Sequence, residues 1–152
     1  MTPPHNESRD WTVRLFVYRY ILEHERAPTL TEIADGLQLD PCQVRTACER
    51  LNERHALFLE PGTVTIRMAH PFSGVPTPFR VHTHGHTYWA NCAWDALGIP
   101  AMLRADAAVE AACGDSWKAI LLRVEGDRVL GHGELIHFAL PFRRWYEDLV
   151  FT

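Results

Sequence analysis

The chain has 152 residues, of which 47% are hydrophobic, enough for one compact domain or two small lobes that share a core. Its formal net charge is −4 and its sequence pI is about 6.1, so the composition gives no general reason to expect a nucleic-acid partner. No apolar run is long enough to span a bilayer, and the polar N-terminus has no apolar signal region. We therefore expect a soluble, cytoplasmic protein with no membrane partner.

The N-terminal part of the sequence contains start signals for three helices. Residues 1–9 are polar and are expected to be disordered, and Asp10 is a candidate N-cap for a helix from Trp11 to Glu25. The tetrapeptide Thr29-Leu30-Thr31-Glu32 fits a capping box at the start of a short second helix. Asp40-Pro41 then predicts a third helix, with proline at its first position, that ends near residue 54.

Two short strands at residues 56–59 and 63–68, joined by a turn, follow the third helix. Three helices and a β-hairpin predict a winged-helix-like lobe at residues 10–68. Such units often bind DNA through the third helix, but acidic residues outnumber basic ones in this lobe. We therefore favour a structural lobe over a DNA-reading one.

A stiff, proline-containing linker is expected at residues 69–78, before a core domain at residues 79–152. A strand is predicted at 79–82 and a turn at His84-Gly85-His86, with a helix after them. Further strands are predicted at residues 107–113, 117–125, 128–132 and 135–140, and a helical segment at 143–151. The expected fold class is α+β, a winged-helix-like three-helix lobe followed by a small mixed or antiparallel sheet flanked by helices.

The segment T-Y-W-A-N-C-A-W-D-A-L-G-I-P-A-M-L, at residues 87–103, contains the strongest chemical signal. A helix that begins near Thr87 or Tyr88 and ends at Gly98 would place Cys92 and Asp95 at positions i and i+3, on one face. Its other residues are mostly apolar, which favours the neutral form of a carboxyl group. From these residues alone, a buried structural cysteine beside a surface aspartate is the more common arrangement.

Part of this segment, N-C-A-W-D-A-L-G-I-P-A-M-L, resembles the active-site helix of the alkylmercury (organomercurial) lyase family. The family pattern is a cysteine, two residues, an aspartate and an apolar run into Pro-Ala. The resemblance extends from about Trp11 to the end of the chain and is best at residues 79–103, with further matches at 136–138 and 145–148. It also indicates that the chain is short at its C-terminus, because family members continue further.

The resemblance implies an enzyme that binds an organomercurial or a soft metal ion at Cys92 and protonates the carbon of the carbon–mercury bond from Asp95. A thiolate is the soft donor that suits Hg(II), and a positioned carboxyl group can supply the proton. No cofactor is implied, because Hg(II) or another soft metal is a ligand of the substrate or product. Small thiols are the other expected partners.

The sequence departs from the family at its second active-site cysteine. The matching stretch G-H-G-E-L contains no cysteine, so the positions near Gly133 and Glu134 cannot supply a thiolate. His132 and Glu134 could donate nitrogen or oxygen, which are harder ligands. Cys113 matches a further family cysteine that is better regarded as structural. We therefore take Cys92 as the main metal ligand, with Cys113, His132 and Glu134 as additional candidates.

Two other functions are compatible with the sequence. A non-catalytic metal-binding or sensing homologue would keep Cys92 without the second thiolate, and a winged-helix regulator would bind DNA.

His82, His84 and His86 alternate and could hold Zn²⁺ or Cu²⁺ if they lay on a strand, but Gly85 favours a turn. The four cysteines show no paired spacing, so we expect free thiols, with Cys42 and Cys48 as small core residues.

Overall fold

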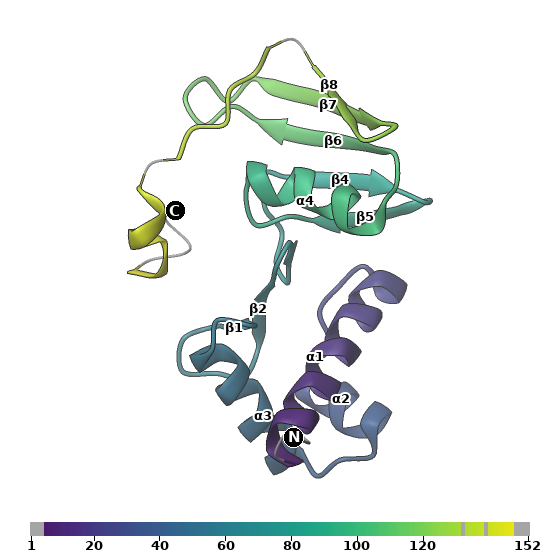
Figure 1. Ribbon diagram of the computed structural model, residues 1–152, viewed down its shortest axis with the longest axis vertical. Helices are drawn as coiled ribbons and strands as arrows, with labels where there is room; N and C mark the ends of the chain where they lie inside the picture. The colour runs from purple at the N-terminus through teal and green to yellow at the C-terminus, as the bar shows by residue number, and fades with distance from the viewer. Residues whose placement is uncertain (1–4, 132, 139, 148–152) are drawn as a thin grey trace.

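The computed structural model describes residues 5–131, 133–138 and 140–147 (Figure 1). The helices are α1 (His5–His24), α2 (Leu30–Leu37), α3 (Pro41–Glu53), α4 (Ala93–Leu103) and the short 3-10 helix η1 (Phe142–Glu147). The strands are β1 (Phe58–Leu59), β2 (Ile66–Ala69), β3 (Phe72–Ser73), β4 (Arg80–Thr83), β5 (His86–Trp89), β6 (Ala107–Ala112), β7 (Ala119–Glu125) and β8 (Arg128–Leu130). The fold is therefore α+β.

All strand pairs in the two sheets are antiparallel. The smaller sheet has the order β1-β2-β3 and the larger one the order β5-β4-β6-β7-β8. Helix α4 packs against β4 and β6, whereas α1, α2 and α3 pack on one another at the other end of the molecule (Figure 1). The predicted N-terminal hairpin and the strands predicted at 79–82, 107–113 and 117–125 are confirmed, and the strand predicted at 128–132 is confirmed as β8, although β1 and β2 are shorter than expected.

Helices α2 and α3 begin where their capping signals predict. The side chain of Thr29 accepts a hydrogen bond from the Glu32 amide at 3.2 Å, and the Glu32 carboxylate accepts one from the Thr29 amide at 2.8 Å. Asp40 accepts a hydrogen bond from the Cys42 amide at 2.8 Å, with proline in the first turn of α3. Because these caps satisfy amides that lack partners inside the helix, they fix both helix starts.

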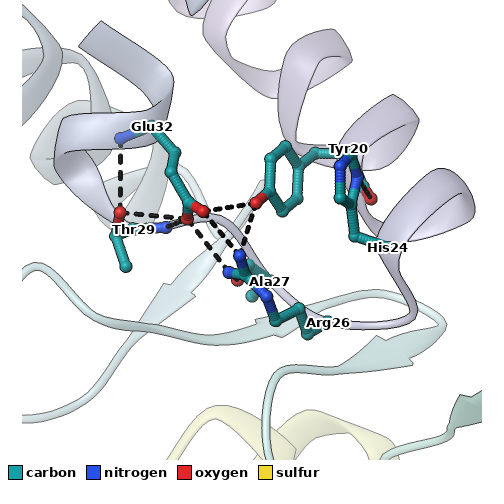
Figure 2. A network of polar contacts seen from close by, with 6 residues as sticks. All are labelled: Tyr20, His24, Arg26, Ala27, Thr29 and Glu32. Carbon is teal, nitrogen blue, oxygen red and sulfur yellow. Dashed lines mark hydrogen bonds and ion pairs between the residues drawn. The ribbon is translucent and has the colours of Figure 1, made fainter. Parts of the chain in front are cut away.

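Glu32 also joins α2 to the end of α1 (Figure 2). Its carboxylate accepts hydrogen bonds from Arg26, at 2.5 and 3.0 Å, and from the Tyr20 hydroxyl. The Arg26 guanidinium, and then the Thr29 amide and the Tyr20 hydroxyl, hold the pKa of the Glu32 carboxyl well below its usual range. The network is exposed to solvent, so we expect it to set the geometry of the α1–α2 turn more than the stability of the fold.

Helix α1 differs from the sequence prediction at its start. It begins at His5, so residues 5–9 are helical and not disordered, and Asp10 lies inside the helix and is not its N-cap. The Asp10 side chain is only 1% exposed and pairs with Arg50 of α3 through contacts of 2.9 and 2.5 Å. The carboxylate that suggested a helix start is therefore half of a buried ion pair between α1 and α3.

The expected linker at residues 69–78 contains strand β3 and part of the core. Phe72 is fully buried, and a β-bridge joins it to Ala90. Its ring meets the rings of Tyr18 and Tyr88 edge-on, at centroid distances of 6.2 and 5.3 Å. One continuous cluster of buried side chains runs from α1 through this segment to the larger sheet. The N-terminal helices and the sheet therefore share a single core.

The end of the described chain has less regular structure than the sequence predicted. Residues 135–138 form no strand, and Phe138 packs against Trp94 and Trp145 at ring-centroid distances of 6.2 and 5.0 Å. Phe138 thus makes aromatic contacts with α4 and η1 in place of strand pairing. The predicted helical segment at 143–151 is confirmed only as the 3-10 helix η1, and residues 148–151 lie outside the described part.

No helix within residues 5–131, 133–138 and 140–147 is both long and apolar enough to cross a membrane.

The buried ion pair gives a stability prediction. Asp10→Asn should lower the free energy of unfolding by about 2 kcal/mol, because Arg50 would lose its charged partner in a site shielded from solvent. Urea denaturation followed by circular dichroism measures this change. Arg54→Gln is the control, since Arg54 is 53% exposed and 4.0 Å from Asp10, and its loss should cost less than about 0.5 kcal/mol. Equal effects of the two substitutions would contradict the account.

Candidate functional site

The candidate site is formed where strand β5 gives way to helix α4. The predicted helix from Thr87 to Gly98 is wrong at both ends, because residues 86–89 form β5 and α4 runs from Ala93 to Leu103. Aromatic and β-branched residues pair with β4 there, with Trp89 opposite Arg80. Cys92 is therefore the N-cap of α4, with an extended backbone at φ −151° and ψ 179°, and does not lie within the helix.

Cys92 and Asp95 are in contact, as their spacing predicted. Asp95 is the third residue of α4, and its Oδ2 atom lies 3.6 Å from the Sγ atom of Cys92. The Asp95 side chain is only 13% exposed, and Cys92 is half-buried. Because both side chains project from the first turn of one helix, their approach depends on local geometry alone.

The Cys92 thiol is held in its protonated form by its surroundings. Burial, together with the negative charge of Asp95 and its hydrogen bond to the thiol, raises the pKa of Cys92. The backbone amides of Asp95 and Trp94 oppose this effect, as expected at a helix N-terminus. At neutral pH the thiol therefore carries a proton that it can donate to the Asp95 carboxylate.

His70 is a third polar residue at the site, and the sequence analysis did not identify it. Its Nδ1 atom lies 3.4 Å from Oδ2 of Asp95, and its carbonyl oxygen accepts a hydrogen bond from the Tyr18 hydroxyl at 2.6 Å. The Asn91 amide nitrogen lies 3.4 Å from the same imidazole nitrogen. The Phe72–Ala90 bridge brings these segments together, and no local sequence signal indicates such a long-range contact.

Aromatic side chains of β1, α4 and the C-terminal segment form contacts near this group. Trp94 follows Cys92 by two residues and meets Phe138, while Phe58 packs edge-on against His70 at 5.2 Å. Tyr146 of η1 lies beside Phe58 at a ring-centroid distance of 6.3 Å. The Tyr146 side chain is 51% exposed. His70 therefore has an apolar ring beside its imidazole.

The additional candidate ligands do not complete a metal site in the described part of the chain. There, no group of three or more His, Cys, Asp or Glu side chains is arranged to hold a metal ion. Cys113 lies in the turn after β6, Glu134 is exposed, and His132 lies outside the described residues. A site built from Cys92, Cys113 and Glu134 together is therefore absent from the described residues.

The alternating histidines are separated by a tight turn, as Gly85 suggested. His84 and Gly85 have φ values of 51° and 82°, so the chain reverses between β4 and β5. His86 pairs with Glu25 at 3.0 Å, whereas His82 lies 3.2 Å from Glu110. These side chains have separate partners and form no shared metal site.

All four cysteines are free thiols in different environments. Cys48 is buried, which raises its pKa to about 11, and Cys42 is exposed, so the expectation that both are core residues holds only for Cys48. Hydrogen bonds from the Ser116 side chain, and then from the backbone amides of Ser116 and Asp115, lower the pKa of Cys113. Cys92 contacts a carboxylate side chain, that of Asp95, at 3.6 Å.

Comparisons with known proteins agree with the resemblance seen in the sequence. The family model of the MerB alkylmercury lyases matches residues 72–150, just over half of the chain. The fold is similar to that in the crystal structure of the mercury-bound form of MerB2, with a TM-score of 0.65. The two sequences are 20% identical, and the match covers 85% of this chain but only 60% of that one, which is less than two thirds of its length. Among curated proteins, none matches this chain.

The raised pKa of Cys92 and the lowered pKa of Cys113 predict how these cysteines react with iodoacetamide. Because only the thiolate attacks, Cys113 should be alkylated at lower pH than Cys92, as resolved by peptide mass spectrometry. In Asp95→Asn, the loss of the carboxylate removes its negative charge and its hydrogen bond to the thiol, which both raise the pKa of Cys92. The pH profile of Cys92 alkylation should therefore move to lower pH. The Cys113 profile is the internal control and should not change. A Cys92 profile that stays fixed or moves to higher pH would refute this electrostatic description.

Proposed function

Because the chain belongs to the alkylmercury lyase family, we propose that it binds organomercurial species or soft metal ions at Cys92 and cleaves carbon–mercury bonds with a proton from Asp95. The contact of 3.6 Å between Cys92 Sγ and Asp95 Oδ2 is the observation that carries this proposal. It joins a soft sulfur donor to a group that can accept and return a proton. The chemistry needs no cofactor, because mercury arrives with the substrate.

Capture of the substrate begins at the Cys92 thiol. As sulfur bonds to mercury, it displaces the anion or thiolate that accompanied the R–Hg group, and the thiol proton passes to the Asp95 carboxylate. The short separation permits this transfer, and the raised pKa of Cys92 means that a nearby base is needed to form the thiolate at neutral pH. The products of this step are a sulfur-bound organomercurial and a neutral Asp95 carboxyl group.

Cleavage then uses the proton that Asp95 has received. The carboxyl group protonates the carbon as the carbon–mercury bond breaks, which releases R–H, leaves Hg(II) on Cys92 and returns Asp95 to its carboxylate form. The proton in the hydrocarbon is therefore the one that began on the Cys92 thiol. The Asp95 side chain is 13% exposed, so it is largely shielded from water during this transfer.

Mercury needs further sulfur ligands for this reaction in our proposal. One thiolate completes only the linear state in which carbon is the second ligand, and residues 131–134 contain no cysteine. Additional electron density on mercury would weaken the bond to carbon, and small thiols from solution are suitable donors. The absence of a second cysteine at residues 131–134 also favours the alternative function, a non-catalytic metal-binding or sensing homologue that holds Hg(II) at Cys92.

We further propose that the N-terminal region is a winged-helix-like support at residues 10–68, connected through 69–78 to the core domain at 79–152. The Tyr18 hydroxyl of α1 holds the His70 carbonyl, and Tyr88 of β5 donates to the Leu22 carbonyl at 3.0 Å. The candidate reading helix α3 uses Arg50 in the buried pair with Asp10, which removes a cation from any phosphate contact. A salt-dependent mobility shift of duplex DNA on binding this chain would instead favour the alternative function of a winged-helix DNA-binding regulator.

The first functional prediction concerns mercury affinity. Cys92→Ser should weaken Hg(II) binding by more than about tenfold in a buffer of competing thiol, because the mercury ligand beside Asp95 is lost. Cys42→Ser is the matched control, since Cys42 is an exposed thiol remote in sequence from the site, and it should have little effect. Mercury competition titrations measure both values, and similar losses would deny Cys92 a special role.

The second functional prediction concerns added thiol. Single-turnover release of hydrocarbon from a bound organomercurial should rise steeply with small-thiol concentration, because the chain supplies one sulfur at the site. Glu134→Cys, at a position that the family resemblance matches to the second active-site cysteine, should increase release at low thiol, and Glu134→Ser is its control. Gly133 is the poorer position for a new cysteine because its φ of 91° is strained for any side chain.

Rapid release without thiol would contradict the single-sulfur account. No release under any condition, with Hg(II) still bound at Cys92, would favour the non-catalytic homologue.

A further inference from the structure

A cavity of about 530 Å³ lies on the larger sheet, where strands β5, β4, β6 and β7 run side by side. Arg80 and Glu110 line it, whereas the next residue on β4, Val81, and the preceding one on β6, Val109, are buried in the core. Helix α4 packs against β4 and β6 and contributes to that core (Figure 1). Because successive side chains of a strand point to opposite faces, the cavity opens on the face away from the core.

The cavity combines small side chains on the sheet with two large aromatic ones. Ala112 of β6 lies opposite Ala119 of β7, and both line the cavity. Trp89, the last residue of β5, and Trp117, in the loop between β6 and β7, line it as well. The two alanines leave space above the sheet that larger side chains would fill, and the indoles give that space apolar walls.

The Trp117 side chain is exposed to solvent although its backbone is strained. It is 74% exposed, and its φ of 56° lies in the left-handed region that bulky residues disfavour. The Trp117 amide donates to the Cys113 carbonyl, and the Cys113 amide donates to the Lys118 carbonyl, both at 2.9 Å. These bonds hold the loop in a conformation that keeps a large ring in water beside the cavity. Strain of this kind is concentrated at functional sites, and a stacked ligand would cover the ring.

The Arg80 guanidinium supplies a positive charge to the same cavity. It lies over the Trp89 ring, 5.4 Å from the centroid, and donates to Glu110 at 3.2 Å. Within the described residues Glu110 is the only hydrogen-bond partner of this side chain, which is 45% exposed, so most of its five N–H donors remain available. The other Glu110 oxygen lies 3.2 Å from Nε2 of His82, so the carboxylate is already shared between two partners.

We propose that this cavity binds a small aromatic carboxylate, with its flat ring against Trp117 and the alanines and its carboxylate on Arg80. The indoles and alanines favour a flat apolar body. The planar guanidinium fork matches a carboxylate, whereas a cationic ligand would meet the Arg80 charge. The lining includes neither Cys92 nor Asp95. The site is therefore separate from the proposed chemistry, and its test needs no lyase activity.

The test uses 2-naphthoate as the probe and the indole N–H signals in heteronuclear NMR spectra as the readout. The signals of Trp89 and Trp117 should shift in a saturable way with a Kd below about 1 mM, while those of Trp11 and Trp94 should not move. The neutral analogue 2-naphthamide should bind about fivefold more weakly or worse, because it has no charge for Arg80. The cation 2-naphthylmethylammonium should bind more weakly still.

Two substitutions separate the charge from the stacking. Arg80→Gln should lower the affinity for 2-naphthoate to that for 2-naphthamide, because the charged fork is lost. Trp117→Ala should weaken both ligands about fivefold or more, and its exposed position means that the fold should persist, as thermal unfolding checks. Trp11→Ala is the matched control, since Arg14 lies over the Trp11 ring at 5.2 Å on α1, outside the cavity. Both affinities should be unchanged in that variant.

Four results would overturn the proposal. They are equal affinities for 2-naphthoate and 2-naphthamide, unchanged binding of 2-naphthoate by Arg80→Gln or by Trp117→Ala, shifts confined to tryptophans outside the cavity, and no saturable binding by the unmodified chain.

Discussion

The contact between the Cys92 sulfur and the Asp95 carboxylate is the interaction on which the proposed chemistry depends. It exists because β5 ends at Trp89 and α4 begins at Ala93, which leaves Cys92 as the N-cap and Asp95 in the first turn. At this position the helix amides favour a thiolate, whereas burial and the carboxylate favour the thiol. The thiol therefore keeps its proton at neutral pH, and in our proposal it releases that proton to Asp95 when sulfur bonds to mercury.

The rest of the fold supports this junction from several directions. The Phe72–Ala90 bridge ties β3 to the residues just before Cys92, and it places His70 beside Asp95. Helix α1 holds the same turn through the Tyr18 hydroxyl, and one core runs from α1 to the larger sheet. Substitutions in the N-terminal helices can therefore affect the site without touching mercury, because they would move the segment that carries His70.

Local signals in the sequence identified the features that depend on neighbouring residues. The capping box at Thr29, the proline start of α3, the β4–β5 turn and the spacing of Cys92 and Asp95 all follow from such signals. Long-range contacts could not be predicted from local signals. Residues 86–89 form a strand because they pair with β4, and Asp10 forms a buried ion pair with Arg50 instead of capping a helix. His70 was missed for the same reason, since its position beside Asp95 depends on segments brought together by Phe72 and Ala90.

The central claim is that one carboxyl group supplies the proton that breaks the carbon–mercury bond. Single-turnover release of benzene from chain-bound phenylmercury, with excess thiol, tests it most directly when the unmodified chain and Asp95→Asn are compared. The account predicts that Asp95→Asn still binds Hg(II) at Cys92 but releases no benzene, because an amide of the same shape has no proton to transfer. Benzene release by Asp95→Asn at the rate of the unmodified chain would contradict it.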